Sequence, residues 1–209
     1  MRDAAVAAAL DDAQTTRVIC AADEEQMLIE RCLAGDTESF RPFVQRYQRV
    51  AFSVALRMLG SRADAEDVAQ QAFTDAYAAL ERFRGEGRSN AFYAWLLRIV
   101  INRAKDVLKS KKRTEEPLAS EEVSGNQAMF TQEPGSPEAE AGQAEDRRML
   151  EAALMRLAPK YREILILKDV EGLAYEEIRS ILRLPVTTLK IRAVRARSKM
   201  RQELEALRR

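Results

Sequence analysis

A single tryptophan lies among basic and hydrogen-bonding residues within 83–113, FRGEGRSNAFYAWLLRIVINRAKDVLKSKKR. At about 100° per residue, Trp95 shares one helical face with four polar residues, Arg98, Asn102, Lys105 and Lys109. An indole can stack on an unpaired base while neighbouring cations hold phosphates. This face therefore has the chemistry needed to hold single-stranded nucleic acid.

The opposite face of the same stretch is apolar, which allows a second interpretation of the tryptophan. That face comprises Tyr93, Leu96, Leu97, Val100, Ile101, Ala104, Val107 and Leu108. Helices with one charged face are common, so Trp95 could equally be a core residue beside a solvated face. Spacing alone favours neither interpretation. The helix is expected to begin after a turn that contains Gly85 and Gly87, with Ser89 or Asn90 as its cap.

A second basic segment closes the chain and has helix-turn-helix spacing. The sequence predicts a short helix over Tyr175–Leu182, a turn over 183–185 and a long helix from about Thr187. On the long helix an apolar stripe faces the domain: Leu189, Ala193, Ala196, Met200, Leu204 and Leu207. Six other residues face outward: Thr187, Lys190, Ile191, Val194, Arg195 and Ser198. The alternative is a basic C-terminal helix without a DNA-binding role, whose cations interact favourably with the negative end of the helix dipole. The preceding helix and turn favour DNA binding.

An acidic face distinguishes the segment 61–83, SRADAEDVAQQAFTDAYAALERF, which predicts an amphipathic helix. Its polar side carries Asp64, Asp67, Gln70, Gln71 and Asp75. One interpretation is that this polar face is simply exposed to solvent. A docking surface for a basic helix is the alternative, because unbalanced like charge gains from a complementary partner.

Composition argues against enzyme chemistry and against membrane insertion. The chain has no histidine, and Cys20 and Cys32 are too isolated for a metal site. It also lacks a phosphate-cradling glycine loop and a nucleophile-elbow pattern. We therefore expect no catalytic residue, no metal and no cofactor. The run Ala4–Leu10 lacks the basic start of a signal peptide, and no apolar run approaches about 20 residues, so we expect a cytoplasmic protein.

The 209 residues predict an all-α protein with two helical domains joined by a flexible acidic linker. An alanine-rich extension (1–23) precedes a first domain (24–113), a linker (114–146) and a second domain (147–209). The linker contains prolines, glycines and nine acids but no lysine or arginine. In the first domain we expect helices that end at Gly35 and Gly60, followed by one that opens at Ser61.

Two extended motifs together resemble an extracytoplasmic-function (ECF) sigma factor. They are DAEDVAQQAF, ALERFRG and AFYAWLLRIVINRAKD in the first domain, and LAPKYREILILKDVEGLAYEEIRSILRLPVTTLKIRAVRAR in the second. The resemblance covers about Glu24 to Arg209 except the linker. It implies a bacterial initiation factor with a region 2 domain for the −10 promoter element and a region 4 helix-turn-helix for the −35 element. The implied partners are core RNA polymerase, through its β′ clamp helices and β flap, promoter DNA and an anti-sigma factor, with no small-molecule substrate.

The resemblance also implies three sets of site residues. Polymerase binding would use Asp64, Glu66, Asp67, Gln70, Gln71 and Asp75. Binding of the −10 strand would use Arg84, Ser89, Asn90, Phe92, Tyr93, Trp95, Arg98, Asn102, Lys105 and Lys109. Recognition of the −35 element would use Thr187, Thr188, Lys190, Ile191, Arg192, Arg195 and Arg197.

The chain departs from the family pattern in its helix-turn-helix. Arg179 and Arg183 stand where small or glycine-like residues are usual, and Ile191 replaces a commonly small polar residue.

Two rival functions remain open. A conventional dimeric helix-turn-helix regulator would leave the Trp95 face unexplained, and a helical adaptor would show no salt-dependent DNA binding.

Overall fold

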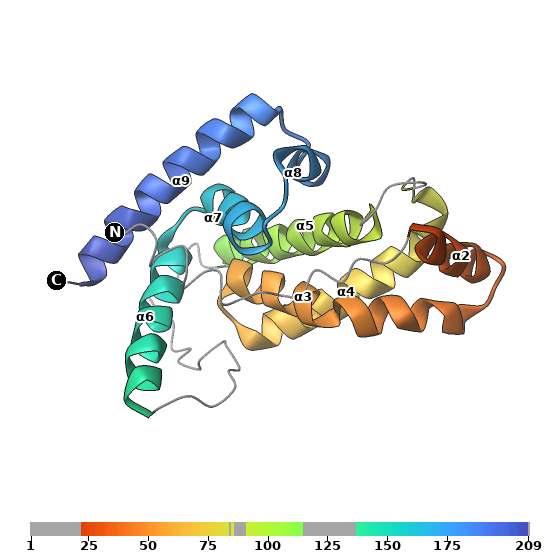
Figure 1. Ribbon diagram of the computed structural model, residues 1–209, viewed down its shortest axis with the longest axis horizontal. Coiled ribbons are helices and arrows are strands. Elements are labelled where there is room, and N and C mark those ends of the chain that lie inside the picture. Colours follow the sequence, from red (N-terminus) through yellow and green to blue (C-terminus); the bar gives the residue numbers. More distant parts are fainter. Residues whose placement is uncertain (1–21, 84, 86–90, 115–136, 209) are drawn as a thin grey trace.

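The computed structural model describes the backbone of residues 22–83, 85, 91–114 and 137–208, and every regular element among them is helical (Figure 1). The first domain contains α2 (Ala22–Leu33), α3 (Arg41–Leu59), α4 (Arg62–Ala78) and α5 (Ala91–Thr114). The second contains α6 (Pro137–Arg156), α7 (Pro159–Leu165), α8 (Tyr175–Leu182) and α9 (Val186–Leu207). Shorter turns of helix span Thr37–Phe40, Leu80–Arg82 and Ile166–Val170. The expected all-α architecture is confirmed.

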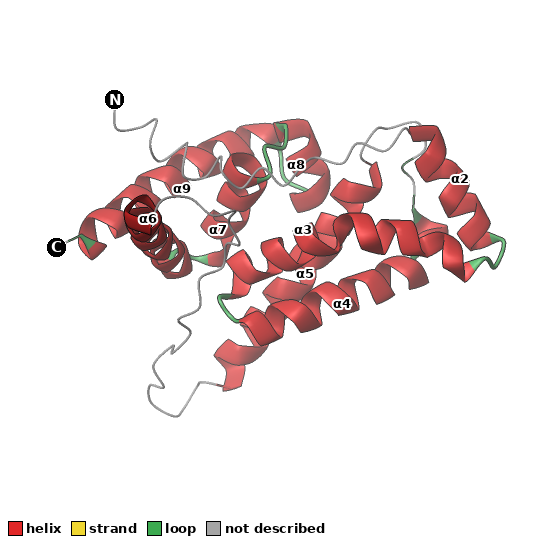
Figure 2. Ribbon diagram, turned by 60° about the horizontal axis from the view of Figure 1, so that its bottom comes forward, coloured by secondary structure: helices red, strands yellow, loops and turns green. Residues whose placement is uncertain are grey.

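The first domain is built on the mutual packing of α3, α4 and α5 (Figure 2). Phe43, Met58, Leu97 and Ile101 are fully buried between them, as the apolar periodicity predicts. The boundary between α3 and α4 follows from two adjacent residues. Gly60 ends α3 with a φ of 72°, and the Ser61 hydroxyl then accepts the backbone N–H of Asp64 at 3.4 Å.

The second domain packs α7 and α8 against α9, and the expected apolar stripe of α9 is buried from Leu189 to Leu204, with Leu207 partly buried. Its first helix, however, differs from the expectation. We expected the linker to reach residue 146, but α6 begins at Pro137. The reason is local: proline is favoured in a first helical turn, where Glu138 and Glu140 suit the positive end of the helix dipole.

The two domains touch, and α5 lies between the rest of the first domain and α7–α8 of the second (Figure 1). Further contacts join α3 to α6 and α7. Buried apolar residues from both domains form one continuous cluster. No helix within the described ranges is long and apolar enough to cross a bilayer.

The turn of the helix-turn-helix holds a side chain in an unfavourable conformation. Arg183 ends α8 with a φ of 55° and a ψ of 42°, and no other non-glycine residue among those described has a positive φ. Its N–H donates to the Arg179 carbonyl at 2.9 Å, which closes the last turn of α8. A side chain in this left-handed region costs about 1 kcal/mol, a cost that glycine avoids.

We predict that Arg183→Gly raises the free energy of unfolding of the second domain by about 1 kcal/mol, because the backbone strain is removed. Urea denaturation followed by circular dichroism measures this change. Arg183→Lys is the matched control, since it keeps both the charge and the strained Cβ, and its stability should equal that of the wild type. Equal stability of the glycine and lysine variants would show that the conformation carries no strain.

Candidate polymerase and nucleic-acid interface

The acidic face of α4 is partly exposed and partly engaged with α5. Glu66, Asp67, Gln70 and Gln71 are exposed, and Glu66 accepts only a neighbouring contact from Arg62 at 2.9 Å on the same helix. These four exposed side chains can reach a partner, although Gln71 also donates to Asp75 on the same helix.

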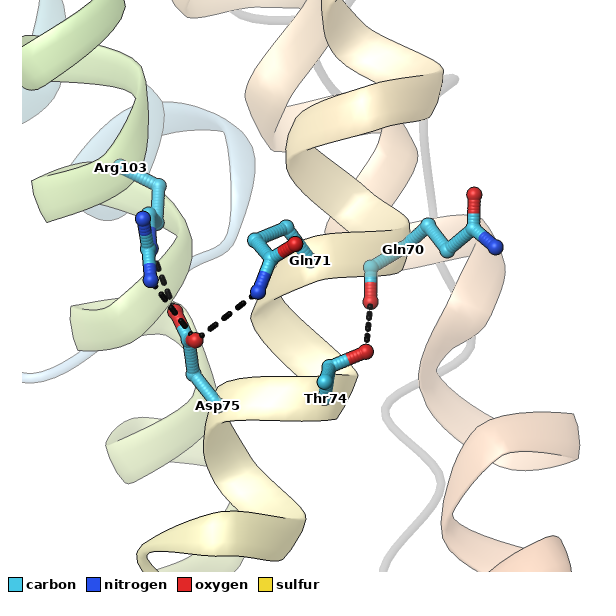
Figure 3. A network of polar contacts seen from close by, with 5 residues as sticks. All are labelled: Gln70, Gln71, Thr74, Asp75 and Arg103. Carbon is cyan, nitrogen blue, oxygen red and sulfur yellow. Dashed lines mark hydrogen bonds and ion pairs between the residues drawn. The ribbon is translucent and has the colours of Figure 1, made fainter.

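The other two carboxylates of this face, Asp75 and Asp64, have partners on α5. Figure 3 shows the first of them, Asp75, with Arg103 and Gln71. Asp75 accepts two hydrogen bonds from the Arg103 guanidinium, one of them 2.7 Å from Nη2 to Oδ1, and a third from Gln71 Nε2 at 3.1 Å. Asp64 Oδ2 lies 2.5 Å from Lys111 Nζ. The like charge on the expected acidic face is thus partly balanced within the domain. The pattern along α4 could not reveal this, because both cations come from another helix.

These contacts change the protonation equilibria of both carboxyl groups. Hydrogen bonds from Arg103 lower the pKa of Asp75. Burial by itself would raise the pKa of Asp64, but hydrogen bonds from Lys111 and Ser61 outweigh it and lower the pKa. Both groups are therefore firmly ionised, and their charge is already balanced within the domain.

The aromatic residues at the start of α5 lie mostly in the core. Phe92 is fully buried between Phe43, 4.2 Å away between ring centroids, and Tyr47, and its backbone N–H donates to Glu25 Oε1 at 2.9 Å. Phe92 therefore offers no surface to DNA, which corrects its expected role in −10 binding. Of the other residues expected there, Arg84, Ser89 and Asn90 lie outside the described residues.

Trp95 combines features of both interpretations. Its ring packs against Phe83 at 5.2 Å and Phe92 at 5.6 Å between centroids, yet the residue is only half-buried. The aromatic cluster thus fixes the indole while leaving part of it exposed. This is the arrangement that a rigid stacking platform requires.

The polar residues of the Trp95 face divide into two groups. Asn102 and Lys109 are exposed, whereas Arg98 and Lys105 are half-buried. Burial lowers the pKa of Arg98, and the nearby positive charge of Arg183 lowers it further. Arg98 and Lys105 are therefore partly covered in this arrangement of the domains.

On α9 the residues expected at the −35 element also divide into two groups. Thr187, Thr188, Lys190, Ile191 and Arg195 are exposed on the side away from the core, as the helical periodicity predicts. By contrast, two arginines are engaged by acids of their own domain. Arg192 Nη1 donates to Glu163 Oε1 at 2.8 Å, and Arg197 donates to Asp169, with Nη2 2.5 Å from Oδ1. Arg192 is also half-buried, so it anchors α9 rather than reaching outward.

Glu163 on α7 joins the two domains through charge. Its side chain is only 4% exposed and meets two cations, Arg192 of its own domain and Lys105 of α5. Lys105 Nζ lies 2.7 Å from Glu163 Oε2, an ion pair without the alignment of a hydrogen bond. Removing a cation from a buried carboxylate is costly, because part of the negative charge is then left uncompensated.

Two further polar contacts cross the interface. The Tyr93 hydroxyl donates to Glu171 Oε2 at 2.6 Å, and the Arg162 guanidinium donates to the carbonyl of Met58. Burial raises the pKa of Glu171, an effect opposed by the Tyr93 hydrogen bond and by the charge of Arg57. Tyr93 is itself nearly buried, so in this arrangement it serves the interface.

Sequence reasoning missed both acids of this interface. The sequence did carry a signal for Glu163, because this acid immediately precedes the apolar run Ile164–Leu167 and is therefore close to the core. An acid in such a position is seldom buried unless a cation pairs with it. Glu171 carried no comparable signal.

The comparisons with known proteins agree with the two-domain arrangement. Residues 43–114 match the family described as sigma-70 region 2, and residues 147–200 match sigma-70, region 4. The chain is 34% identical over 190 residues to the RNA polymerase sigma-H factor of Pseudomonas aeruginosa, covering 88% of this chain and 96% of the relative. It is also 34% identical over 188 residues to the ECF RNA polymerase sigma-E factor of Escherichia coli, covering 88% and 95%.

Two solved structures share the fold. CnrH, in complex with the cytosolic domain of CnrY, aligns with a TM-score of 0.59 at 26% identity, over 89% of this chain and 99% of CnrH. The sigma factor RpoE of Bartonella quintana, in complex with the anti-sigma factor NepR, aligns with a TM-score of 0.63 at 22% identity, over 80% and 98%.

We predict that removing the α5 contacts across the interface separates the domains. In Tyr93→Phe/Lys105→Met, one hydrogen bond and one ion pair are lost while Glu163 keeps Arg192. Each loss should destabilise the closed form, in which the two domains touch, by about 1.5 kcal/mol relative to an open form in which they are apart. This is roughly a tenfold change in the ratio of closed to open chains. Energy transfer between dyes on the two domains of the free chain measures this ratio.

Arg103→Met is the control for this experiment, because it breaks a contact of comparable kind within the first domain. Its energy transfer should match the wild type. An unchanged distance in the double variant would mean that apolar contacts between α5 and α8 suffice to hold the domains together.

Proposed function

The chain belongs to the ECF family of RNA polymerase sigma factors, and from that premise we propose how its surfaces share the work of transcription initiation. The observation that carries the proposal is the position of α9. It follows a short helix and a tight turn, buries one apolar stripe and exposes Thr187, Lys190 and Arg195 on the opposite side. The first turns of such a helix reach base edges in the major groove, so we assign α9 to the −35 element.

We assign the −10 element to the Trp95 face of α5. A half-buried indole held by Phe83 and Phe92 can stack on an unpaired base without losing much side-chain freedom. Asn102 and Lys109 extend the face along the helix for contacts with the backbone of the strand. The glycine-bearing loop before α5 belongs to the same proposed site. Phe92 is not included, because it is buried.

Core polymerase binding is assigned to the exposed part of the α4 face, Glu66, Asp67, Gln70 and Gln71. We propose the β′ clamp helices as its partner and the β flap as the partner of the second domain. Asp64 and Asp75 take a supporting role in this proposal. Their ion pairs with Lys111 and Arg103 fix α4 against α5, and so fix the polymerase surface relative to the −10 surface.

The closed arrangement bears on regulation. Lys105 and Tyr93 of the proposed −10 surface take part in contacts with the second domain, so that surface is not fully free until the domains separate. Interfaces between domains of one chain often resemble transient ones, and in this one polar contacts lie beside the apolar cluster. We propose that an anti-sigma factor holds the resting chain and that polymerase binding favours the open form, with 115–136 as the linker. CnrH was solved with the cytosolic domain of CnrY, and we place the action of this chain in the cytoplasm as well.

The first test of this function is promoter-directed transcription by core polymerase with the purified chain. Wild type should support it, whereas Asp67→Lys should weaken core binding at least tenfold, because like charges then meet at the interface. A pull-down titration and run-off transcription report the two effects. Glu205→Lys, on the distal part of α9, makes the same change in net charge and should behave as wild type.

If the Asp67 variant binds core polymerase normally with its helix content intact, the α4 assignment is wrong. If instead the wild type binds promoter duplex as a dimer and gives no transcript with core polymerase, the conventional helix-turn-helix regulator replaces the present proposal.

A second prediction concerns DNA opening. Trp95→Ala should leave core binding nearly normal but reduce open complexes, because losing one stack on a base costs about 1–3 kcal/mol. Permanganate reactivity of −10 thymines, on duplex and on a premelted bubble, measures the opening. The bubble should restore only the part of the defect that is due to strand separation.

Phe83→Leu controls for packing in this experiment, since Phe83 is buried and supports the indole. Phe83→Leu should lower the thermal stability of the chain but have little effect on the extent of DNA opening. If Trp95→Ala and Phe83→Leu lose stability alike while both open DNA at the wild-type rate, Trp95 is a core residue only.

A further inference from the structure

The proposed −35 helix exposes apolar side chains that its fold does not use. Among the described residues, five large apolar side chains are strongly exposed, and two of them lie one turn apart on α9: Ile191 is 54% exposed and Val194 is 66% exposed. Neither contributes to the core. Exposed apolar surface of this kind commonly marks a contact with a partner.

The position of the pair on α9 is well defined. Thr187, Ile191 and Val194 follow one another at i, i+4 and i+7, so they form a row along one side of the helix. That row lies opposite the buried stripe of Leu189 and Ala196. The ion pairs of Arg192 with Glu163 and Arg197 with Asp169 hold the helix in this rotation, so the row points directly away from the domain.

The charges around the row indicate what covers it. Lys190 lies on one side and Arg195 on the other, and both are exposed. Lys190 approaches the ring of Tyr175 at 5.9 Å, and no ion pair of Arg195 is found in the described part of the chain. A protein partner would have to desolvate these cations around an apolar centre, whereas charged residues are depleted at the cores of protein interfaces. A DNA groove lined by phosphates accepts them readily.

Within the major groove only one base presents a methyl group, the 5-methyl of thymine. Ile191 and Val194 are separated by about 4.5 Å along the helix axis, close to the roughly 3.4 Å step between bases on one strand. They can therefore meet the methyl groups of neighbouring positions while Lys190 and Arg195 contact phosphates or guanine.

We propose that Ile191 and Val194 read the 5-methyl groups of thymine in the −35 element of this chain's promoters. The inference rests on the proposed role of α9 in −35 recognition and makes it more specific. It gives Ile191, where a small polar residue is usual, a chemical role, and it assigns Val194 to the recognition surface. The −35 element should contain thymine at one or two positions facing this row, on either strand.

Replacing thymine by deoxyuridine tests the proposal, because it removes only the methyl group. Holoenzyme is first used to select its −35 element in vitro, and each thymine of that element is then replaced singly. Closed-complex binding to these duplexes should weaken about fourfold at one or two positions, the effect expected from one buried methyl. Ile191→Ser and Val194→Ser should each bind the thymine and deoxyuridine duplexes equally at one of those positions. Both side chains are exposed, so helix content and core affinity should stay normal.

The outcomes separate the proposal from the function on which it rests. Arg195→Ala should weaken binding to the −35 element whether thymine or deoxyuridine is present. If it does, but no deoxyuridine substitution matters, or the selected element has no thymine, methyl recognition is wrong and the role of α9 stands. If scrambling the −35 element changes nothing, the role of α9 fails as well. If the serine variants keep the preference for thymine, or lose core affinity instead, the row docks on something other than the methyl groups.

Discussion

The contact of Glu163 with Lys105 and Arg192 is the interaction on which the arrangement of this molecule depends. A carboxylate that is only 4% exposed has lost most of its hydration and must find compensating charge. One cation comes from α9 and fixes its rotation. The other comes from α5, in the other domain. A single buried acid therefore sets both the orientation of the proposed −35 helix and the closeness of the two domains.

The two ion pairs of Glu163 respond differently when the domains separate. Arg192 belongs to the same domain and can stay paired when the domains separate, whereas Lys105 must leave. Besides packed apolar residues of both domains, the interface contains the Tyr93 hydrogen bond to Glu171 and the Arg162 guanidinium on a backbone carbonyl. Polar contacts such as these can be exchanged for water or phosphate at modest cost. The closed arrangement is thus compatible with an open form in which Lys105 meets DNA.

The first domain uses charge in a different way. Ion pairs from α5 to Asp64 and Asp75 neutralise the ends of the acidic face, so its exposed centre, with Asp67, is the part left for a partner. The same α5 carries Trp95 on an aromatic base. One helix thereby links the surface proposed for polymerase to the surface proposed for the melted strand, which places both in a fixed relation.

The sequence by itself determined the helices except the start of α6, because apolar periodicity, Gly60, Ser61 and the spacing around Arg183 are local signals. It also determined the outward face of α9 and the family. Only the tertiary structure decided which polar and aromatic residues are free. It buried Phe92, paired Asp75 with Arg103 and Arg192 with Glu163, and brought Lys105 to the other domain. The three ion pairs join residues 28, 29 and 58 positions apart in the chain. Helical phase reports the direction of a side chain on its own helix, but not which distant charge lies opposite once the helices pack.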